Sequence, residues 1–293
     1  MIIVLGKSGY LATALINWCK IKNFANIQLV SRAQTNYFDQ SILASFLLKI
    51  KCSFLINAAG YTGKPNVDAC ESSKYECLQG NAVLPGIIRE VCEDVKIPWG
   101  HISSGCIYSG RRDDGNGWTE EDEPNFSFRS PPCSFYSGTK ALGEEVLEGA
   151  ENCFVWRLRI PFNHEPSPRN YLQKLLNYEN LLEAENSVSH LAEFCQKCIE
   201  CFTKGVEPGV YNMTNPGSIT TRQVTEWMIK EGLTDKKFNF FDSEEEFMNK
   251  AAIAPRSNCV LDTTKAEKAG IGMRPVEEAM IDSIRKMRQS MLS

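Results

Sequence analysis

The sequence has no long hydrophobic run and no basic run, and these absences narrow the classes of protein it can represent. No stretch approaches the roughly 18 consecutive apolar residues of a membrane-spanning helix. The chain opens on an apolar segment, Met1 to Leu5, without the basic region of a signal peptide. The formal net charge is −4, so we expect neither a nucleic acid nor a membrane as partner. We expect a cytoplasmic protein.

Cysteine is abundant, with twelve residues in the chain of 293. Most lie within apolar patterns, so we expect reduced thiols packed as small hydrophobic side chains. Cys195, Cys198 and Cys201 have the spacing C-x-x-C-x-x-C, which resembles part of an iron–sulfur signature. The surrounding segment, His190 to Lys204, has apolar residues at helical spacing, and no fourth cysteine followed by proline lies nearby. We interpret the three cysteines as one face of a helix, with a metal site as the alternative, and expect no metal.

Short apolar runs alternate with helix-length segments through the first half of the chain. We expect strands over Ile2–Leu5, Ile27–Val30, Phe54–Ile56, Trp99–Ile102 and Cys153–Leu158. We expect helices over Tyr10–Lys22, Ser41–Lys51, Asn81–Cys92 and Tyr136–Leu147. This alternation predicts an α/β fold with a Rossmann-type, doubly wound parallel sheet. We assign residues 1–160 to that sheet and 161–293 to a smaller mixed lobe, with segments of the lobe returning to the sheet.

A glycine-rich turn follows the first expected strand. Gly6, Gly9 and Ala12 have the spacing G-x-x-G-x-x-A and open the first expected helix. Glycines allow the backbone to approach a pyrophosphate, and the helix N-terminus supplies N–H donors. A structural turn is the alternative. The residues expected to bind a dinucleotide here are Gly6, Ser8, Gly9, Tyr10 and Leu11.

The second expected strand ends at Ser31-Arg32. Sites for NAD usually carry an acidic residue at this point to bind the ribose hydroxyls. A hydroxyl and a cation suit the 2′-phosphate of NADPH instead, so we expect Ser31 and Arg32 to bind that phosphate. A solvated arginine is the alternative for Arg32, and NADH is the alternative cofactor.

Tyr136 and Lys140 have the spacing Y-x-x-x-K at the start of an expected helix. This spacing places both side chains on one helix face. A nearby ammonium group is expected to lower the phenol pKa from about 10, so that the tyrosine can give and regain a proton.

Four motifs together resemble the extended short-chain dehydrogenase/reductase family. They are the glycine turn, Asn57-Ala58-Ala59-Gly60 after the third strand, Ser103-Ser104 after the fourth, and Tyr136 with Lys140. The resemblance implies that Asn57, Ala58 and Ala59 contact the cofactor. It also implies that Ser104 and Tyr136 polarise a substrate carbonyl, and that Lys140 holds the nicotinamide ribose.

Further blocks resemble the plant-type UDP-4-keto-6-deoxyglucose 3,5-epimerase/4-reductases, which also occur in giant viruses and are related to the dTDP-4-dehydrorhamnose reductases. The blocks are Gly60–Glu71, Gly105-Cys106-Ile107, Arg159-Ile160-Pro161, Pro168-Arg169-Asn170-Tyr171, Thr214-Asn215-Pro216-Gly217 and Ala254–Asn258. The resemblance implies a UDP-4-keto-6-deoxyglucose-type substrate, NADPH, an upstream 4,6-dehydratase that supplies the substrate, and a homodimer. If the source is a virus, we expect the protein in the host cytoplasm.

The same resemblance assigns roles to individual residues. Cys106 and Lys174 would be the acid–base groups of epimerisation, against the alternatives of a buried small side chain and a solvated lysine. Cys133 and His164 are possible substitutes. Thr62, Asn170, Arg256 and Asn258 would bind substrate, with Arg256 on the diphosphate unless it forms a surface salt bridge. Residues 129–133 have no clear counterpart and could alter the mouth of the site.

Three alternatives stay open. The protein could be a 4-keto reductase alone, acting on a sugar that has already been epimerised. It could be a non-catalytic NADP-binding regulatory subunit, although both Tyr136 and Lys140 are present. The nucleotide could be dTDP or GDP. A 4,6-dehydratase is disfavoured, because that chemistry needs an acidic pair where this chain has Gly105-Cys106.

Overall fold

A six-stranded parallel sheet forms the centre of the protein in the computed structural model, which describes residues 1–292. The strands are β1 (Ile2–Leu5), β2 (Ile27–Val30), β3 (Phe54–Asn57), β4 (Trp99–Ser104), β5 (Cys153–Leu158) and β10 (Gly209–Asn212). Their order is β10-β5-β4-β3-β1-β2, and every neighbouring pair is parallel. The predicted doubly wound sheet is confirmed, and the five expected strands are all present. The sixth strand, β10, was not predicted and comes from the second half of the chain.

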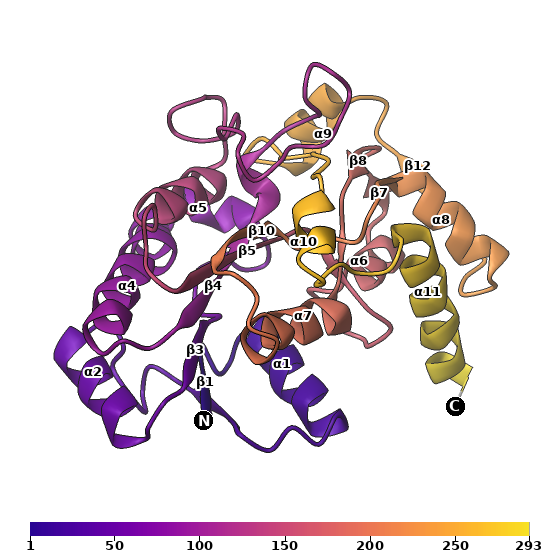
Figure 1. Ribbon diagram of the computed structural model, residues 1–293. Coiled ribbons are helices and arrows are strands. Elements are labelled where there is room, and N and C mark those ends of the chain that lie inside the picture. The colour runs from indigo at the N-terminus through magenta and orange to yellow at the C-terminus, as the bar shows by residue number, and fades with distance from the viewer. Residues whose placement is uncertain (293) are drawn as a thin grey trace.

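Helices cover both faces of this sheet (Figure 1). On one face α1 (Tyr10–Ile21) packs beside α7 (Leu191–Thr203), and on the other α2 (Gln40–Lys49) packs beside α4 (Leu84–Asp94). The strands β1, β3, β4 and β5 are buried along their whole length, as expected for a parallel sheet between two helical layers. Further helices are α3 (Lys74–Leu78), α5 (Phe135–Glu145) and α10 (Thr264–Lys268).

A smaller lobe has its own hydrophobic core, which includes residues from α6 (Tyr171–Asn177), α8 (Thr221–Lys230) and α11 (Val276–Leu292). Two-residue strands accompany these helices: β6 (Pro161–Phe162), β7 (Asn180–Leu181), β8 (Glu185–Asn186), β9 (Ser189–His190), β11 (Ile219–Thr220) and β12 (Asn239–Phe240). The short helix α9 (Glu244–Ala251) has no buried residue. The boundary between the two lobes at residue 160 stays a prediction. Both β10 and α7 follow residue 160 in the chain but pack with the main sheet.

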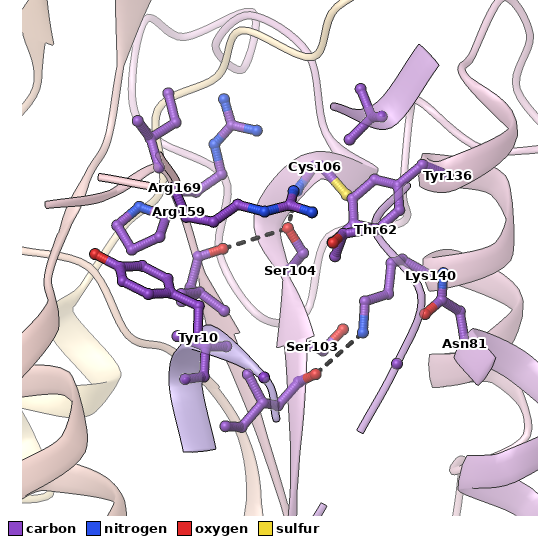
Figure 2. Close-up of a pocket in the computed structure, with 18 of the residues that line it drawn as sticks. Tyr10, Thr62, Asn81, Ser103, Ser104, Cys106, Tyr136, Lys140, Arg159 and Arg169 are labelled. Atoms are coloured by element: carbon purple, nitrogen blue, oxygen red, sulfur yellow. Dashed lines mark hydrogen bonds between the residues drawn. The ribbon is translucent and has the colours of Figure 1, made fainter. Parts of the chain in front are cut away.

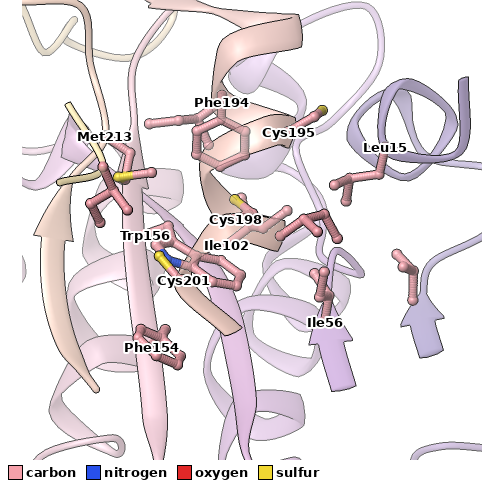
Figure 3. Close-up of a cluster of buried hydrophobic side chains, with 14 of the residues drawn as sticks. Leu15, Ile56, Ile102, Phe154, Trp156, Phe194, Cys195, Cys198, Cys201 and Met213 are labelled. Atoms are coloured by element: carbon pink, nitrogen blue, oxygen red, sulfur yellow. The ribbon is translucent and has the colours of Figure 1, made fainter. Parts of the chain in front are cut away.

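The three cysteines of the C-x-x-C-x-x-C segment all lie on α7 and are buried in the main core (Figure 3). Their neighbours there include Phe154, Trp156 and Phe194. The helical interpretation is confirmed. All twelve cysteines are free, and only Cys133 among them is not buried. Within residues 1–292, no cluster of histidine, cysteine and acidic side chains is suited to hold a metal ion.

In the part of the chain that the structure describes, no helix has both the length and the apolar character needed to cross a bilayer.

The helix expected to begin at Asn81 begins earlier, at Lys74, and contains a π-helical turn at Gln79–Val83. Asn81 lies in this turn. Its side chain accepts a hydrogen bond from the backbone N–H of Tyr61 (2.9 Å) and donates one to the Tyr61 carbonyl (2.8 Å). Such π turns often occur at functional sites. Here the turn directs a buried amide at the loop that follows β3.

Gly143, on α5, lies against the π turn, and this contact predicts an effect on stability. A Cβ atom at Gly143 would lie 2.1 Å from the Asn81 carbonyl oxygen, whereas one at Gly86 would meet only Val146 Cγ2, at 3.9 Å. We expect Gly143→Ala to destabilise the fold by about 1–3 kcal/mol, because backbone must move. We expect Gly86→Ala to be neutral or to stabilise by up to about 1 kcal/mol. Urea denaturation measures both, and equal stability of the two variants would contradict the packing.

Candidate active site

A cavity of about 760 Å³ opens at the carboxyl ends of β1, β3, β4 and β5 (Figure 2). The strand order reverses at β1, which has β2 on one side and β3 on the other. Ligands of open α/β sheets bind at such a reversal. Predicted site residues that line the cavity are Ser8, Gly9, Tyr10, Leu11, Ala58, Ala59, Thr62, Ser104, Cys106, Tyr136, Lys140, Lys174 and Arg256.

The glycine turn requires its first glycine for two reasons. Gly6 has a φ of +89°, and a Cβ atom there would lie 2.8 Å from the backbone nitrogen of Ala59. Side chains other than hydrogen are therefore excluded by backbone conformation and by the contact between the turns after β1 and β3. The buried side chain of Asn57 supports that contact. Its Oδ1 accepts a hydrogen bond from the backbone N–H of Ala59 (3.1 Å), and its Nδ2 is hydrogen-bonded to His101 Nδ1 (3.0 Å). Asn57 does not line the cavity.

The N-terminus of α1 faces the cavity without a side-chain cap. Gly9 occupies the cap position, no side chain accepts from the first turn, and that turn contains no acidic residue. Unpaired N–H groups at a helix start, together with the positive end of the helix dipole, form a site for an anion. Ser8, Gly9, Tyr10 and Leu11 line the cavity at this point. These features fit the pyrophosphate of a dinucleotide.

Arg32 lines a second cavity, of about 360 Å³, which shares Ser8, Gly9, Ala58, Ala59 and Gly60 with the first. Its guanidinium carbon lies 4.5 Å above the centre of the Phe38 ring. Arg32 is thus oriented by stacking at a place suited to one end of an elongated ligand. The expectation for Ser31 needs correction: its N–H and hydroxyl both bond Gln34 Oε1 at 3.0 Å, and Ser31 lines neither cavity.

Ser104 and Tyr136 meet at the centre of the first cavity (Figure 2). Ser104 ends β4, and Tyr136 lies in the first turn of α5, whose N-cap Ser134 accepts from Ser137 N at 3.1 Å. Burial raises the pKa of Tyr136 well above its usual range and the nearby Cys106 adds to this, whereas hydrogen bonding with Ser104 opposes it. The expected lowering of this pKa is therefore wrong for the structure. The ammonium of Lys140 donates to the Ile102 carbonyl (3.1 Å), and burial lowers the pKa of Lys140.

Cys106 follows Ser104 in a short 3₁₀ turn at the end of β4, and its N–H donates to Ser104 Oγ (3.3 Å). The thiol is buried but lines the cavity. Burial raises the pKa of Cys106, while hydrogen bonding with Ser104 and the charge of Arg159 oppose that rise. Figure 2 shows the Arg159 side chain extending toward Ser104 and Cys106.

Lys174 lies on α6 in the smaller lobe and lines the same cavity. Its ammonium group has no hydrogen-bond partner among residues 1–292. Burial lowers the pKa of Lys174, and the charges of Arg169 and Arg256 lower it further. The substitutes Cys133 and His164 do not line the cavity. The structure thus brings Cys106 and Lys174 together in one site.

The expectation that Asn170 and Asn258 bind substrate needs correction. The Asn170 amide is fully buried, accepts from Leu172 N (3.2 Å) as the cap of α6, and donates to the Asn163 and Glu165 carbonyls. Asn258 Oδ1 accepts from Asn186 (3.1 Å). Neither residue lines the cavity.

Other cavity residues were not chosen from the sequence, among them Asn81, Arg159 and Arg169. Arg169 directly precedes Asn170 in the block Pro168-Arg169-Asn170-Tyr171, and its guanidinium donates to the Gly63 carbonyl (2.6 Å). The sequence analysis chose Asn170 from this block as a substrate-binding residue, whereas Arg169 is the residue that lines the cavity. Arg129, in the segment 129–133, forms a surface ion pair with Glu145 (2.6 Å).

Comparison with known proteins agrees with the fold. Residues 1–289 match the family of the RmlD substrate binding domain. A bifunctional dTDP-4-dehydrorhamnose 3,5-epimerase/dTDP-4-dehydrorhamnose reductase from Arabidopsis thaliana is 33% identical over 284 residues, covering 95% of this chain and 90% of that protein. A trifunctional UDP-glucose 4,6-dehydratase/UDP-4-keto-6-deoxy-D-glucose 3,5-epimerase/UDP-4-keto-L-rhamnose-reductase from the same plant is 32% identical, but this chain spans only 41% of its length.

Solved structures show the same fold. The UDP-rhamnose synthase of Acanthamoeba polyphaga mimivirus has a TM-score of 0.88 at 23% identity, covering 98% of this chain and 99% of that one. A dTDP-4-dehydrorhamnose reductase from Bacillus anthracis, solved in complex with NADP, has a TM-score of 0.80 at 17% identity, with 99% and 98% coverage. The family match over residues 1–289 and the plant relative that is 33% identical along nearly the whole chain show that this chain belongs to the RmlD substrate-binding-domain family.

Proposed function

We propose that this protein converts UDP-4-keto-6-deoxy-D-glucose to UDP-L-rhamnose, by 3,5-epimerisation followed by NADPH-dependent reduction of the C4 carbonyl. One observation carries the proposal: a single cavity is lined by a hydroxyl–phenol pair, Ser104 and Tyr136, and by two further acid–base groups, Cys106 and Lys174. The plant relative that is 33% identical is named for both activities, and the mimivirus protein of the same fold is named for UDP-rhamnose.

The residues around the glycine turn fit NADPH. The uncapped start of α1 would bind the pyrophosphate, and Arg32 in the adjoining cavity would bind the 2′-phosphate. Lys140, buried at the carboxyl end of β4, would hold the nicotinamide ribose. When bound, NADPH supplies the hydride that reduces C4.

Tyr136 and Ser104 would act on the oxygen of the C4 carbonyl. A tyrosine phenol is protonated near neutral pH, and burial raises the pKa of Tyr136 further, so this group can donate a proton as the oxygen gains charge. The Ser104 hydroxyl adds a second donor. The same two groups would stabilise the enolate oxygen during epimerisation, since charge develops at that oxygen in both reactions.

Epimerisation requires proton removal from one face of the sugar ring and proton return to the other. The C4 carbonyl acidifies the protons on C3 and C5, so two groups on opposite sides of the ring are sufficient. The pKa of Lys174 is lowered toward the neutral amine, which suits a base, and the pKa of Cys106 is raised, which suits a proton donor. We assign removal of the protons to Lys174 and their return to Cys106.

A 4-keto reductase alone is the nearest alternative, and the positions of Cys106 and Lys174 in the cavity favour the bifunctional enzyme over it. A purely regulatory NADP-binding subunit would not need either group there. The substrate requires a 4,6-dehydratase upstream; a trifunctional plant relative is named for that activity as well. Homodimer formation, cytoplasmic location and the choice of UDP over dTDP or GDP stay part of the proposal.

The cofactor assignment predicts a change of preference in Arg32→Asp. We expect the wild type to have a higher kcat/KM with NADPH than with NADH, and the variant to reduce or reverse that ratio, because aspartate repels the 2′-phosphate and binds ribose hydroxyls. Steady-state kinetics with both cofactors measures the ratio. Arg222→Asp is the control, since Arg222 also stacks on a ring, Phe240, outside both cavities. An unchanged ratio in Arg32→Asp would remove Arg32 from the cofactor site.

Tyr136→Phe removes the proposed proton donor and keeps the ring. We expect C4 reduction to fall by about 10²–10⁴-fold, the usual effect of losing a positioned acid. NADPH binding, followed by fluorescence, should remain nearly intact. Tyr178→Phe, at a tyrosine that is 47% exposed, is the control and should react at the wild-type rate. Wild-type reduction by Tyr136→Phe would show that another group supplies the proton.

Hydrogen exchange separates epimerisation from reduction. In D₂O the wild-type product should carry deuterium at C3 and C5, as determined by NMR. Cys106→Ala should form no L-rhamnose, because no group returns the proton, while the unepimerised 4-keto sugar can still be reduced slowly. The product of Lys174→Ala should carry less deuterium than the wild-type product at C3, at C5 or at both carbons. Cys133→Ala, outside the cavity, should label as the wild type does. Formation of L-rhamnose by Cys106→Ala would refute the role of that thiol, whereas deuterium in an unepimerised sugar reports only proton removal by Lys174.

A further inference from the structure

Two segments far apart in the sequence meet at the mouth of the cavity. The carboxylate of Asp68, in the turn Val67–Glu71, accepts from the backbone N–H groups of Ile253 (3.3 Å) and Ala254 (3.1 Å). It also accepts from Nη1 (2.6 Å) and Nη2 (2.7 Å) of Arg256. Three of these donors bond Oδ1 and one bonds Oδ2. Asp68 itself does not line the cavity, so its link to the cavity runs through Arg256.

Arg256 keeps a defined pair of donors free. Asp68 and the Ala254 carbonyl (2.9 Å) take both hydrogens of Nη1, and Asp68 takes one hydrogen of Nη2. Nε–H and the second hydrogen of Nη2 remain, on the same edge of the guanidinium. Neither has a partner among residues 1–292, and Nε is not buried from solvent. This edge matches two oxygens of a phosphate group.

The guanidinium is held in a second direction as well. Its central carbon lies 5.4 Å from the centre of the Phe247 ring, on α9. The Asp68 and Arg256 side chains are 12% and 19% exposed, so the pair is shielded from water and more rigid than a surface pair. Arg256 lines the cavity, as does Arg169. Two guanidinium groups thus line one cavity, which suits a ligand with more than one negative charge.

We propose that Asp68 is a positioning residue for substrate binding: it fixes Arg256 so that the Nε–Nη2 edge faces the diphosphate of the nucleotide sugar. This inference rests on the proposed function for the class of substrate. The contrary possibility is a simple counter-charge. A counter-charge weakens anion binding, so its removal would make the mouth more positive and tighten binding. Positioning predicts the opposite sign, because a free arginine loses the alignment that makes its fork effective.

Calorimetric titration of the protein with UDP, and then with dTDP, tests whether the loss of the Asp68 charge weakens or tightens nucleotide binding. We expect Asp68→Asn and Arg256→Lys each to weaken UDP binding about tenfold, the scale of a charged hydrogen-bond pair. The double variant should bind no more weakly than Arg256→Lys, since Asp68 acts through Arg256. Glu231→Gln is the matched control: Glu231 also accepts two bonds from an arginine, Arg285, far from the cavity, and its loss should leave UDP binding unchanged.

Kinetics with the nucleotide sugar gives a second readout. Asp68→Asn should raise KM while kcat stays within about twofold, whereas general loss of structure would lower kcat. Unchanged or tighter UDP binding by Asp68→Asn overturns the inference. If that variant does not fold, Arg256→Lys decides, because it keeps a cation beside Asp68 and removes the free edge; unchanged affinity there also overturns it.

The binding assay separates this inference from the proposed function. If the wild type binds UDP, Asp68→Asn binds it more weakly, and no rhamnose forms, then the role of Asp68 stands and the proposed reaction is wrong. If the wild type binds neither UDP nor dTDP, both are overturned.

Discussion

The buried ion pair between Glu144 and Arg157 joins the elements that carry the proposed catalytic groups. Glu144, on α5, accepts from Arg157 Nε (2.9 Å) and Nη2 (2.7 Å) on β5, and from the Ser103 hydroxyl on β4. Both charged side chains are almost inaccessible to water, so separating them would leave an unpaired buried charge, at a cost of about 3–5 kcal/mol. Ser104 follows Ser103, and Lys140 lies one helical turn before Glu144. The relative position of Ser104 and Lys140 therefore depends on this pair.

The site residues come from strand ends and loops that only the topology brings together. The glycine turn, the turn after β3 and Ser104 all follow strands whose carboxyl ends share one edge of the sheet, and the reversal of strand order at β1 separates the helices above that edge. The smaller lobe then adds Lys174 and Arg256 from the other side. Neither half of the chain contains the proposed acid–base groups and the dinucleotide site on its own.

Local patterns predicted the sheet and much of the site, and non-local contacts account for what they missed. Apolar runs identified five strands, but β10 has the sequence Gly-Val-Tyr-Asn, whose two apolar residues do not form such a run. Asn170 was expected to bind substrate, yet its amide caps α6 and its neighbour Arg169 lines the cavity. The pKa of Tyr136 was expected to fall, because spacing shows the nearby Lys140 but not the burial that outweighs it. Asp68 and Arg256 lie too far apart in the sequence for a local pattern to predict their contact.

The proposed epimerisation and reduction both place negative charge on the same oxygen. Removal of a proton from C3 or C5 and delivery of hydride to C4 each convert the C4 carbonyl into an oxyanion, so one pair of donors lowers both barriers. Reduction requires in addition the hydride of NADPH, and epimerisation requires in addition the groups beside the ring carbons. Burial shifts the pKa of Cys106 upward and that of Lys174 downward, and each shift disfavours the charged form of the group. One environment therefore favours both the neutral thiol, which can donate a proton, and the neutral amine, which can accept one.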